Sequence, residues 1–96
     1  MRYNVLTKNS TKQERIVYEV LKDLRIPFKH RWLIGGIEVD FLIGTYAIDI
    51  DGHDQSGERN FKLIEIGYVP IHFSNHYVIN NRDLLKKELL KYGSTH

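Results

Sequence analysis

The stretch from Ile37 to Asp54 constrains the fold of this chain most strongly. It contains two runs in which apolar residues alternate with other residues, and the pair Gly44-Thr45 separates the runs. Alternation with a period of two is typical of strands with one buried face, and a glycine between two such runs favours a tight turn. We therefore predict a β-hairpin, with Val39, Phe41 and Ile43 on one face of its first strand.

Three aspartates of this hairpin share one side of the predicted sheet. A two-residue turn places Ile43 opposite Tyr46 and Asp40 opposite Asp49, whereas a turn two residues longer places Asp40 opposite Asp51. Either register keeps the three carboxylates together, because side chains repeat every two residues along a strand. Two carboxylates about 4 Å apart repel each other by about 1 kcal/mol in water and about 4 kcal/mol in a partly buried site.

A cation is expected to offset this repulsion. Mg²⁺ is a hard ion that prefers oxygen ligands, so the pattern predicts a metal site formed by Asp40, Asp49 and Asp51. The alternative is a solvated acidic face flanked by Lys and Arg. His53 follows at once and is the side chain best suited to general acid–base chemistry near neutral pH. Asp54 could orient His53, bind the metal or cap the next helix.

The rest of the chain predicts the element order α-β-β-β-α-β-α. The elements outside the hairpin are a helix from a cap at Ser10 or Thr11 to about Leu24, a strand over Phe28–Ile34, a helix over about Glu58–Ile66, a strand over Val69–Phe73, a loop over Ser74–Ile79, and a helix from a cap at Asn80 or Asn81 to Gly93. This order predicts a single α/β domain over residues 1–96, with a central mixed sheet flanked by helices.

Glu14 has two interpretations that spacing alone leaves equal. Thr11 and Glu14 match a capping box, in which the glutamate bonds back to the start of the helix. Glu14 also lies at the edge of the buried stripe of the helix, from which it could point across the sheet into the acidic cluster. The sequence names no partner for His30, His72 or His76.

Charge and composition narrow the class of protein. The net charge is only +2, the acids concentrate between residues 38 and 58, and Lys and Arg dominate residues 2–31, which suits an acidic metal site within a basic surround. There is no cysteine and no apolar run that could span a bilayer, so we expect a cytoplasmic protein without thiolate or Cys-based zinc chemistry. The candidate contacts to a phosphate backbone are Lys12, Arg15, Lys29, Arg31, Arg59 and Lys62.

This constellation resembles the PD-(D/E)XK nuclease superfamily. The likeness rests on a Glu in the first helix, a Val-Asp-Phe strand at Asp40, and an Asp-x-Asp-Gly strand end that is followed by His53 and a helix. It is nearest to the very-short-patch-repair (Vsr)-like branch with the phage homing endonucleases called EDxHD, and it runs from about Ser10 to Gly93. The resemblance implies a restriction-endonuclease-like fold and a Mg²⁺ or Mn²⁺ cofactor.

The resemblance also implies a role for each matching residue. The implied assignments are Asp40 as the central metal ligand, Asp49 as the second motif acid with the Asp51 region completing the metal shell, Glu14 as the first-helix acid, and His53 with Asp54 as the His-Asp pair. Two positions depart from the family pattern: Asp51 stands where the motif has Lys, and Val39 stands where it has Pro. The missing Lys leaves the general base open, and His53 is the replacement we expect.

We therefore predict a Mg²⁺-dependent endonuclease that hydrolyses phosphodiester bonds of double-stranded DNA, of the homing-endonuclease or mismatch-repair-like nicking type. Nothing in the sequence resembles a base-reading motif, so recognition is expected from an attached DNA-binding domain, a longer parent chain or a homo-oligomer. Two alternatives stay open. One is a non-catalytic nucleic-acid-binding or assembly module, and the other is a junction- or RNA-directed nuclease on the same fold.

Overall fold

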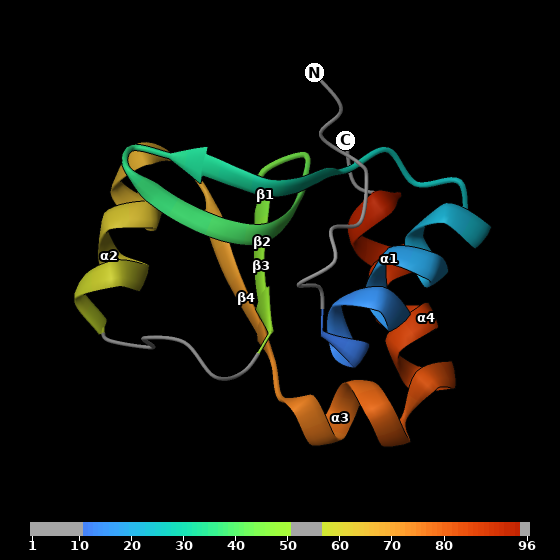
Figure 1. Ribbon diagram of the computed structural model, residues 1–96. Coiled ribbons are helices and arrows are strands. Elements are labelled where there is room, and N and C mark those ends of the chain that lie inside the picture. The colour runs from blue at the N-terminus through green and yellow to red at the C-terminus, as the bar shows by residue number, and fades with distance from the viewer. Residues whose placement is uncertain (1–10, 51–56, 95–96) are drawn as a thin grey trace.

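A four-stranded sheet lies between two layers of helices (Figure 1). The computed structural model describes residues 11–50 and 57–94. Its elements are α1 (Lys12–Asp23), β1 (Lys29–Ile34), β2 (Ile37–Ile43), β3 (Tyr46–Ile50), α2 (Gly57–Ile66), β4 (Val69–Phe73), α3 (Asn75–Asn80) and α4 (Arg82–Gly93). The α/β class and the predicted order of elements are confirmed, with one short helix, α3, added before the last. Within the described residues, no helix has the length and apolar character needed to cross a membrane.

The sheet is mixed and has the strand order β1-β2-β3-β4. The first three strands pair antiparallel, and β4 pairs parallel with β3 after the crossover through α2. Ile43 pairs with Tyr46, so the hairpin has the shorter of the two predicted registers, with Gly44 at φ +57° in the turn. Pro70 lies on β4, which is an edge strand. A proline has no N–H, and an edge strand tolerates this because one of its sides has no neighbouring strand to bond.

Each face of the sheet has its own apolar core. On one face, α1, α3 and α4 cover a core that includes Leu21, Phe41, Ile48 and Leu89. On the other face, α2 covers a smaller core centred on Leu63. These two cores fix the sheet between the helical layers, and they hold the ends of β2 and β3 in place.

The predicted alternation along β2 breaks at Asp40. Phe41 and Ile43 pack towards α1 as expected, but Val39 packs towards α2, so the prediction that these three share one face is wrong. The neighbouring strand changes face at the same level: His30 pairs with Phe41, and Trp32 pairs with Val39. Between them Arg31 has φ +52°, a left-handed conformation that interrupts the regular pleat.

The segment Ser74–Ile79, predicted as a loop, instead contains the helix α3. The Ser74 side chain caps it by accepting a hydrogen bond from the Tyr77 N–H at 3.0 Å, and Val78 is fully buried in the larger core. A helix of six residues is too short to display a helical period in sequence, so only its cap residue could have indicated it.

Candidate active site

The side chains of Asp40 and Asp49 form hydrogen bonds that join β2 to β3 at the end of the β2–β3 ladder. The Asp40 N–H donates to Asp49 Oδ1 at 3.2 Å, and the Ile50 N–H donates to Asp40 Oδ2 at 2.8 Å. Each carboxylate therefore accepts a backbone donor that a regular ladder would give to a carbonyl. The predicted approach of these two acids is confirmed, and these backbone donors partly stabilise their negative charge.

Arg59 of α2 supplies positive charge to this acidic pair. Its Nη1 donates to Asp49 Oδ2, and its Nη2 donates to the Glu38 carbonyl oxygen at 2.6 Å. The side chains of Arg59 and Asp49 are only 15% and 10% exposed, so this is a largely buried ion pair. The cation that the hairpin was predicted to need is thus present within the chain, and it ties α2 to the end of β3.

Glu14 lies in a second polar cluster on the α1 side of the sheet. Its Oε2 lies 2.9 Å from His30 Nε2 and 3.2 Å from Arg31 Nε, and its Oε1 lies 3.2 Å from Arg31 Nη2. The capping box with Thr11 is confirmed. Glu14 does not join the acidic cluster, as the other interpretation had it, because its carboxylate pairs with His30 and Arg31 of β1 instead.

Opposing effects set the ionisation of Glu14. Burial alone would raise its pKa, but hydrogen bonds from Arg31 and His30 outweigh burial, and the pKa of Glu14 is lowered. The hydrogen bonds that Arg31 donates to Glu14 raise the pKa of Arg31, and the charges of Glu14, Glu38 and Asp40 add to this effect. Arg31 therefore carries its charge between the Glu14 cluster and Asp40.

The lowered pKa of Glu14 predicts a pH dependence of stability. Because the folded-state pKa lies below the ordinary value of 4.5, the stabilisation is complete above pH 4.5 and is lost as the pH falls through the folded-state pKa. Urea unfolding of the wild type and of Glu14→Gln should show a difference in free energy that shrinks below pH 4.5. A difference that stays constant between pH 7 and pH 3 would contradict this account.

The remaining predicted site residues are the acids and the histidine after β3 and the candidate phosphate contacts. Asp51, His53 and Asp54 lie outside the described residues. Among the predicted phosphate contacts, Arg31 and Arg59 are engaged in the ion pairs above, and those with exposed side chains are Lys12, Arg15, Lys29 and Lys62. The structure thus divides the predicted cations into two that pair with buried acids and four that are exposed, of which Lys29 lies over the Trp32 ring at 4.2 Å.

The described residues supply part of a set of metal ligands. The carboxylates of Asp40 and Asp49 have the donor chemistry that a hard divalent ion prefers. Residues 11–50 and 57–94 nevertheless bring no three acidic or histidine side chains together as a metal-binding group. Asp40 and Asp49 therefore fit Mg²⁺ or Mn²⁺ only together with a further donor, and Asp51 is the one that the sequence offers.

His30 is the residue of this region to which sequence reasoning assigned no role. Its side chain is 1% exposed, and its ring stacks on Phe41 at a centroid distance of 4.8 Å. It lies sixteen residues from Glu14 in the chain, so no local spacing could connect the two. Its one available signal was its place on a predicted strand, since a histidine that such a strand buries is stable only with a partner.

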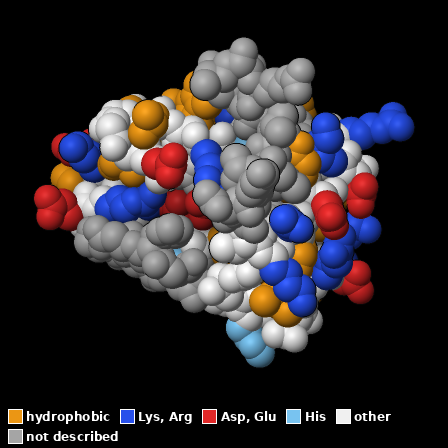
Figure 2. Space-filling view, viewed as in Figure 1, with side chains coloured by type: hydrophobic (Ala, Val, Ile, Leu, Met, Phe, Trp, Pro, Cys, Tyr) orange, Lys and Arg blue, Asp and Glu red, His pale blue; other side chains and the backbone are white. Residues whose placement is uncertain are grey.

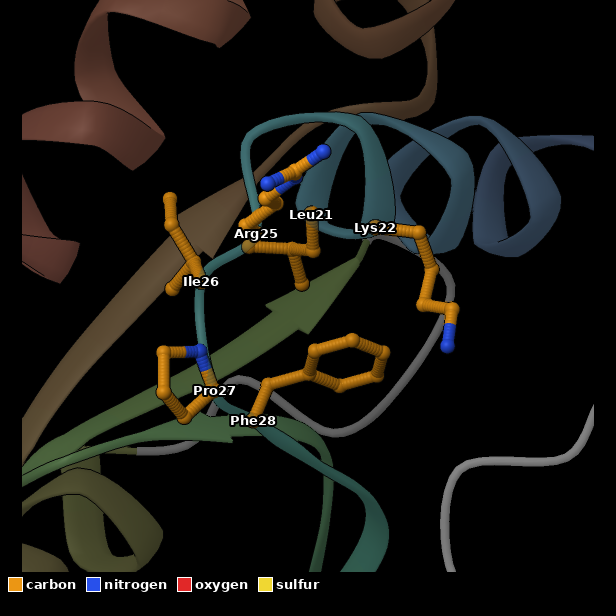
Figure 3. Close-up of a pocket in the computed structure, with 6 residues that line it drawn as sticks. All are labelled: Leu21, Lys22, Arg25, Ile26, Pro27 and Phe28. Atoms are coloured by element: carbon orange, nitrogen blue, oxygen red, sulfur yellow. The ribbon is translucent and has the colours of Figure 1, made fainter.

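The surface around the two clusters is mixed in charge. In the left half of Figure 2, over α2 and the sheet, acidic side chains lie directly beside Lys and Arg side chains. A separate hollow of about 320 Å³ lies at the other end of α1, where Figure 3 shows its lining residues Leu21, Lys22, Arg25, Ile26, Pro27 and Phe28. The lining of this hollow contains no acid and no histidine.

Comparison with known proteins gives a structural likeness. No protein-family model matches the sequence, and no curated protein matches it either. Among solved structures, the "Homing Endonuclease I-Bth0305I Catalytic Domain" is similar, with a TM-score of 0.72 and 24% sequence identity. The match covers 86% of this chain and 94% of that one. This chain therefore has the fold of a homing endonuclease catalytic domain over most of its length.

Proposed function

We propose that this chain is the catalytic domain of a metal-dependent DNA endonuclease, of the Vsr-like branch of the PD-(D/E)XK superfamily. The observation that carries the proposal is the paired approach of Asp40 and Asp49 across β2 and β3. This acidic pair lies in a fold shared with a chain described as a homing endonuclease catalytic domain. Two acids joined across neighbouring strands in this way suit a nearby cation and disfavour a bare phosphate, which supports a catalytic role.

The chain's own residues divide the work of phosphodiester hydrolysis. Asp40, Asp49 and Asp51 would hold Mg²⁺ or Mn²⁺. Such an ion, when bound, polarises a phosphoryl oxygen and lowers the pKa of a bound water. His53 would accept a proton from the attacking water or give one to the leaving oxygen, and Asp54 would orient its ring. The exposed cations of α1, β1 and α2 would contact the DNA backbone without reading its sequence.

Recognition of a particular DNA site is proposed to come from outside this domain. The sequence contains no base-reading motif. A separate DNA-binding domain or a second copy of the chain would supply the contacts that choose the site. A second copy would also allow both strands to be cut, because one such site cuts one strand at a time.

One observation favours a second candidate, a module that binds nucleic acid without cleaving it. Arg59 already pairs with Asp49, so part of the acidic charge is compensated without a metal. In that case Mg²⁺ would have no effect, and neutralising Asp40 would strengthen binding to DNA by removing repulsion between Asp40 and phosphate. The two candidates therefore predict opposite effects of the same change.

The test is cleavage of supercoiled plasmid by the purified protein in Mg²⁺, Mn²⁺ or EDTA. We expect nicked or linear product with either metal and none in EDTA. His53→Ala should lower the rate by about 10²-fold, the lower end of the range for a general acid or base. His76→Ala is the matched control, since His76 is exposed on α3, where Asn80 of the same helix hydrogen-bonds to it. Metal-independent binding without product in any condition would favour the binding module.

A further inference from the structure

The guanidinium of Arg31 is held rigidly next to Asp40. Two of its nitrogens donate to Glu14, in the bidentate geometry that gives Arg–carboxylate pairs their directional strength. Its backbone has φ +52°, a conformation that costs a non-glycine residue free energy and is retained where surrounding contacts enforce it. The contacts with Glu14 thus hold Arg31 in a backbone conformation that is unfavourable by itself.

Glu14 is saturated with donors and acts as the anchor of Arg31. It accepts from Thr11 N–H, from two nitrogens of Arg31 and from His30, and its side chain is 9% exposed. An ionised carboxylate only accepts, so His30 donates from Nε2 to Glu14. His30 is itself fixed by its stack on Phe41 and by an edge contact with Tyr18.

We propose that Arg31 binds a backbone phosphate of the DNA beside the acidic pair, and that Glu14 and His30 are positioning residues for it. This inference rests on the proposed function and adds to it the group that places the phosphate. Arg31 is one-third exposed, and its contacts with the described residues leave Nη1 unused. In the β1–β2 ladder Arg31 lies opposite Asp40, between the pairs His30–Phe41 and Trp32–Val39, so its charge lies close to the acidic pair.

The rigid Arg31 differs from the other predicted phosphate contacts. Lys12, Arg15 and Lys62 are exposed, and Lys29 is exposed with its ammonium 4.2 Å from the centre of the Trp32 ring. Exposed cations give affinity with little geometric control. A guanidinium fixed by Glu14 can fix the distance between a phosphate and the acidic pair. The role of Glu14 in this proposal is therefore to act through Arg31, since its own oxygens are occupied.

The first test compares binding and cleavage by Arg31→Gln and Arg31→Lys. Binding is measured by fluorescence anisotropy of a labelled DNA duplex in EDTA, and cleavage by single-turnover kinetics in Mg²⁺. Arg31→Gln should weaken binding by roughly 10- to 100-fold, the worth of a charge-assisted contact. Arg31→Lys should bind almost as the wild type does but cleave at least about 10-fold more slowly, because a point charge cannot reproduce the fork. Lys86→Gln, an exposed cation of α4, is the control for the loss of one charge.

The second test separates positioning from a merely structural role. His30→Gln keeps a side-chain N–H donor for Glu14, whereas His30→Leu removes it. We expect His30→Gln to restore most of the cleavage rate lost in His30→Leu, with the pH profile of the wild type. Circular dichroism and thermal unfolding of each variant show whether it is folded, and Arg31→Lys provides the comparison if Arg31→Gln does not fold.

The outcomes distinguish this inference from the proposed function. Loss of DNA binding in Arg31→Gln, with no cleavage by any variant in any metal, supports the phosphate contact and overturns the hydrolysis. Metal-dependent cleavage that is equal in the wild type, Arg31→Gln and Lys86→Gln overturns the phosphate contact and leaves the hydrolysis standing. A wild-type protein that neither binds nor cleaves DNA overturns both.

Discussion

Asp40→Asn is expected to lower the rate of DNA cleavage by about 10³-fold or more, the scale on which one preorganised electrostatic group contributes to a site. Asparagine keeps the shape and one acceptor oxygen, so the hydrogen bond from Ile50 N–H at 2.8 Å can persist. What it removes is the negative charge next to Asp49. The variant thus isolates the part of Asp40 that the proposed chemistry needs.

The measurement is single-turnover nicking of plasmid in Mg²⁺, with thermal unfolding recorded on the same samples. Asp23→Asn is the matched control, because Asp23 is an exposed acid at the end of α1, away from the β2–β3 hairpin. It should cleave at the wild-type rate. An Asp40→Asn variant with unchanged cleavage would show that this carboxylate is not part of the reaction, and tighter metal-independent binding of DNA would support the binding module.

Local physics made the elements predictable from sequence. The start of the first helix was predicted from a capping box that the structure contains, and the hairpin was predicted with two possible registers, of which the structure has the shorter. Both features depend on residues within a few positions of each other. The capping box forms because the free backbone N–H groups at a helix start need acceptors. The hairpin forms because apolar side chains must lie on the buried face of each strand.

The break in alternation at Asp40 was not predictable in this way. It depends on the left-handed conformation of Arg31, nine residues earlier and on the neighbouring strand. Arginine has no preference for that conformation, so composition and spacing give no sign of it. The contacts with Glu14 provide the reason, and they exist only after α1 has packed on the sheet.

In the candidate site too, the contacts set by local sequence were predictable, and the contacts set by the packing of distant elements were not. The approach of Asp40 and Asp49 followed from strand pairing, which local sequence determines. The partners of these acids and of Glu14 lie ten to seventeen residues away, on other elements. Charge pairs of this kind depend on the packing of whole helices, so the sequence could name Arg59 and Arg31 as cations but could not say which acid each would meet.

Arg59→Met is expected to reduce the free energy of unfolding by roughly 3 kcal/mol in metal-free buffer, because it leaves the largely buried Asp49 carboxylate without its cation. For a domain of this size that corresponds to a fall in Tm of roughly 12–24 °C. The hydrogen bond to the Glu38 carbonyl oxygen is lost as well. Arg82→Met is the control, since Arg82 forms an exposed pair with Glu19 at 3.5 Å, and it should change stability by about 0.5 kcal/mol or less.

Adding Mg²⁺ to Arg59→Met then links this stability to the proposed chemistry. If Asp40 and Asp49 bind a divalent ion, the loss of Arg59 leaves more negative charge to attract it, and saturating Mg²⁺ should raise Tm more in Arg59→Met than in the wild type. Thermal unfolding in Mg²⁺ and in EDTA measures this directly. Equal shifts in both proteins would mean that Arg59 does not compete with a metal for Asp49. No shift in either would mean that the acidic pair is balanced by arginine alone, and the proposed hydrolysis would then lack its cation.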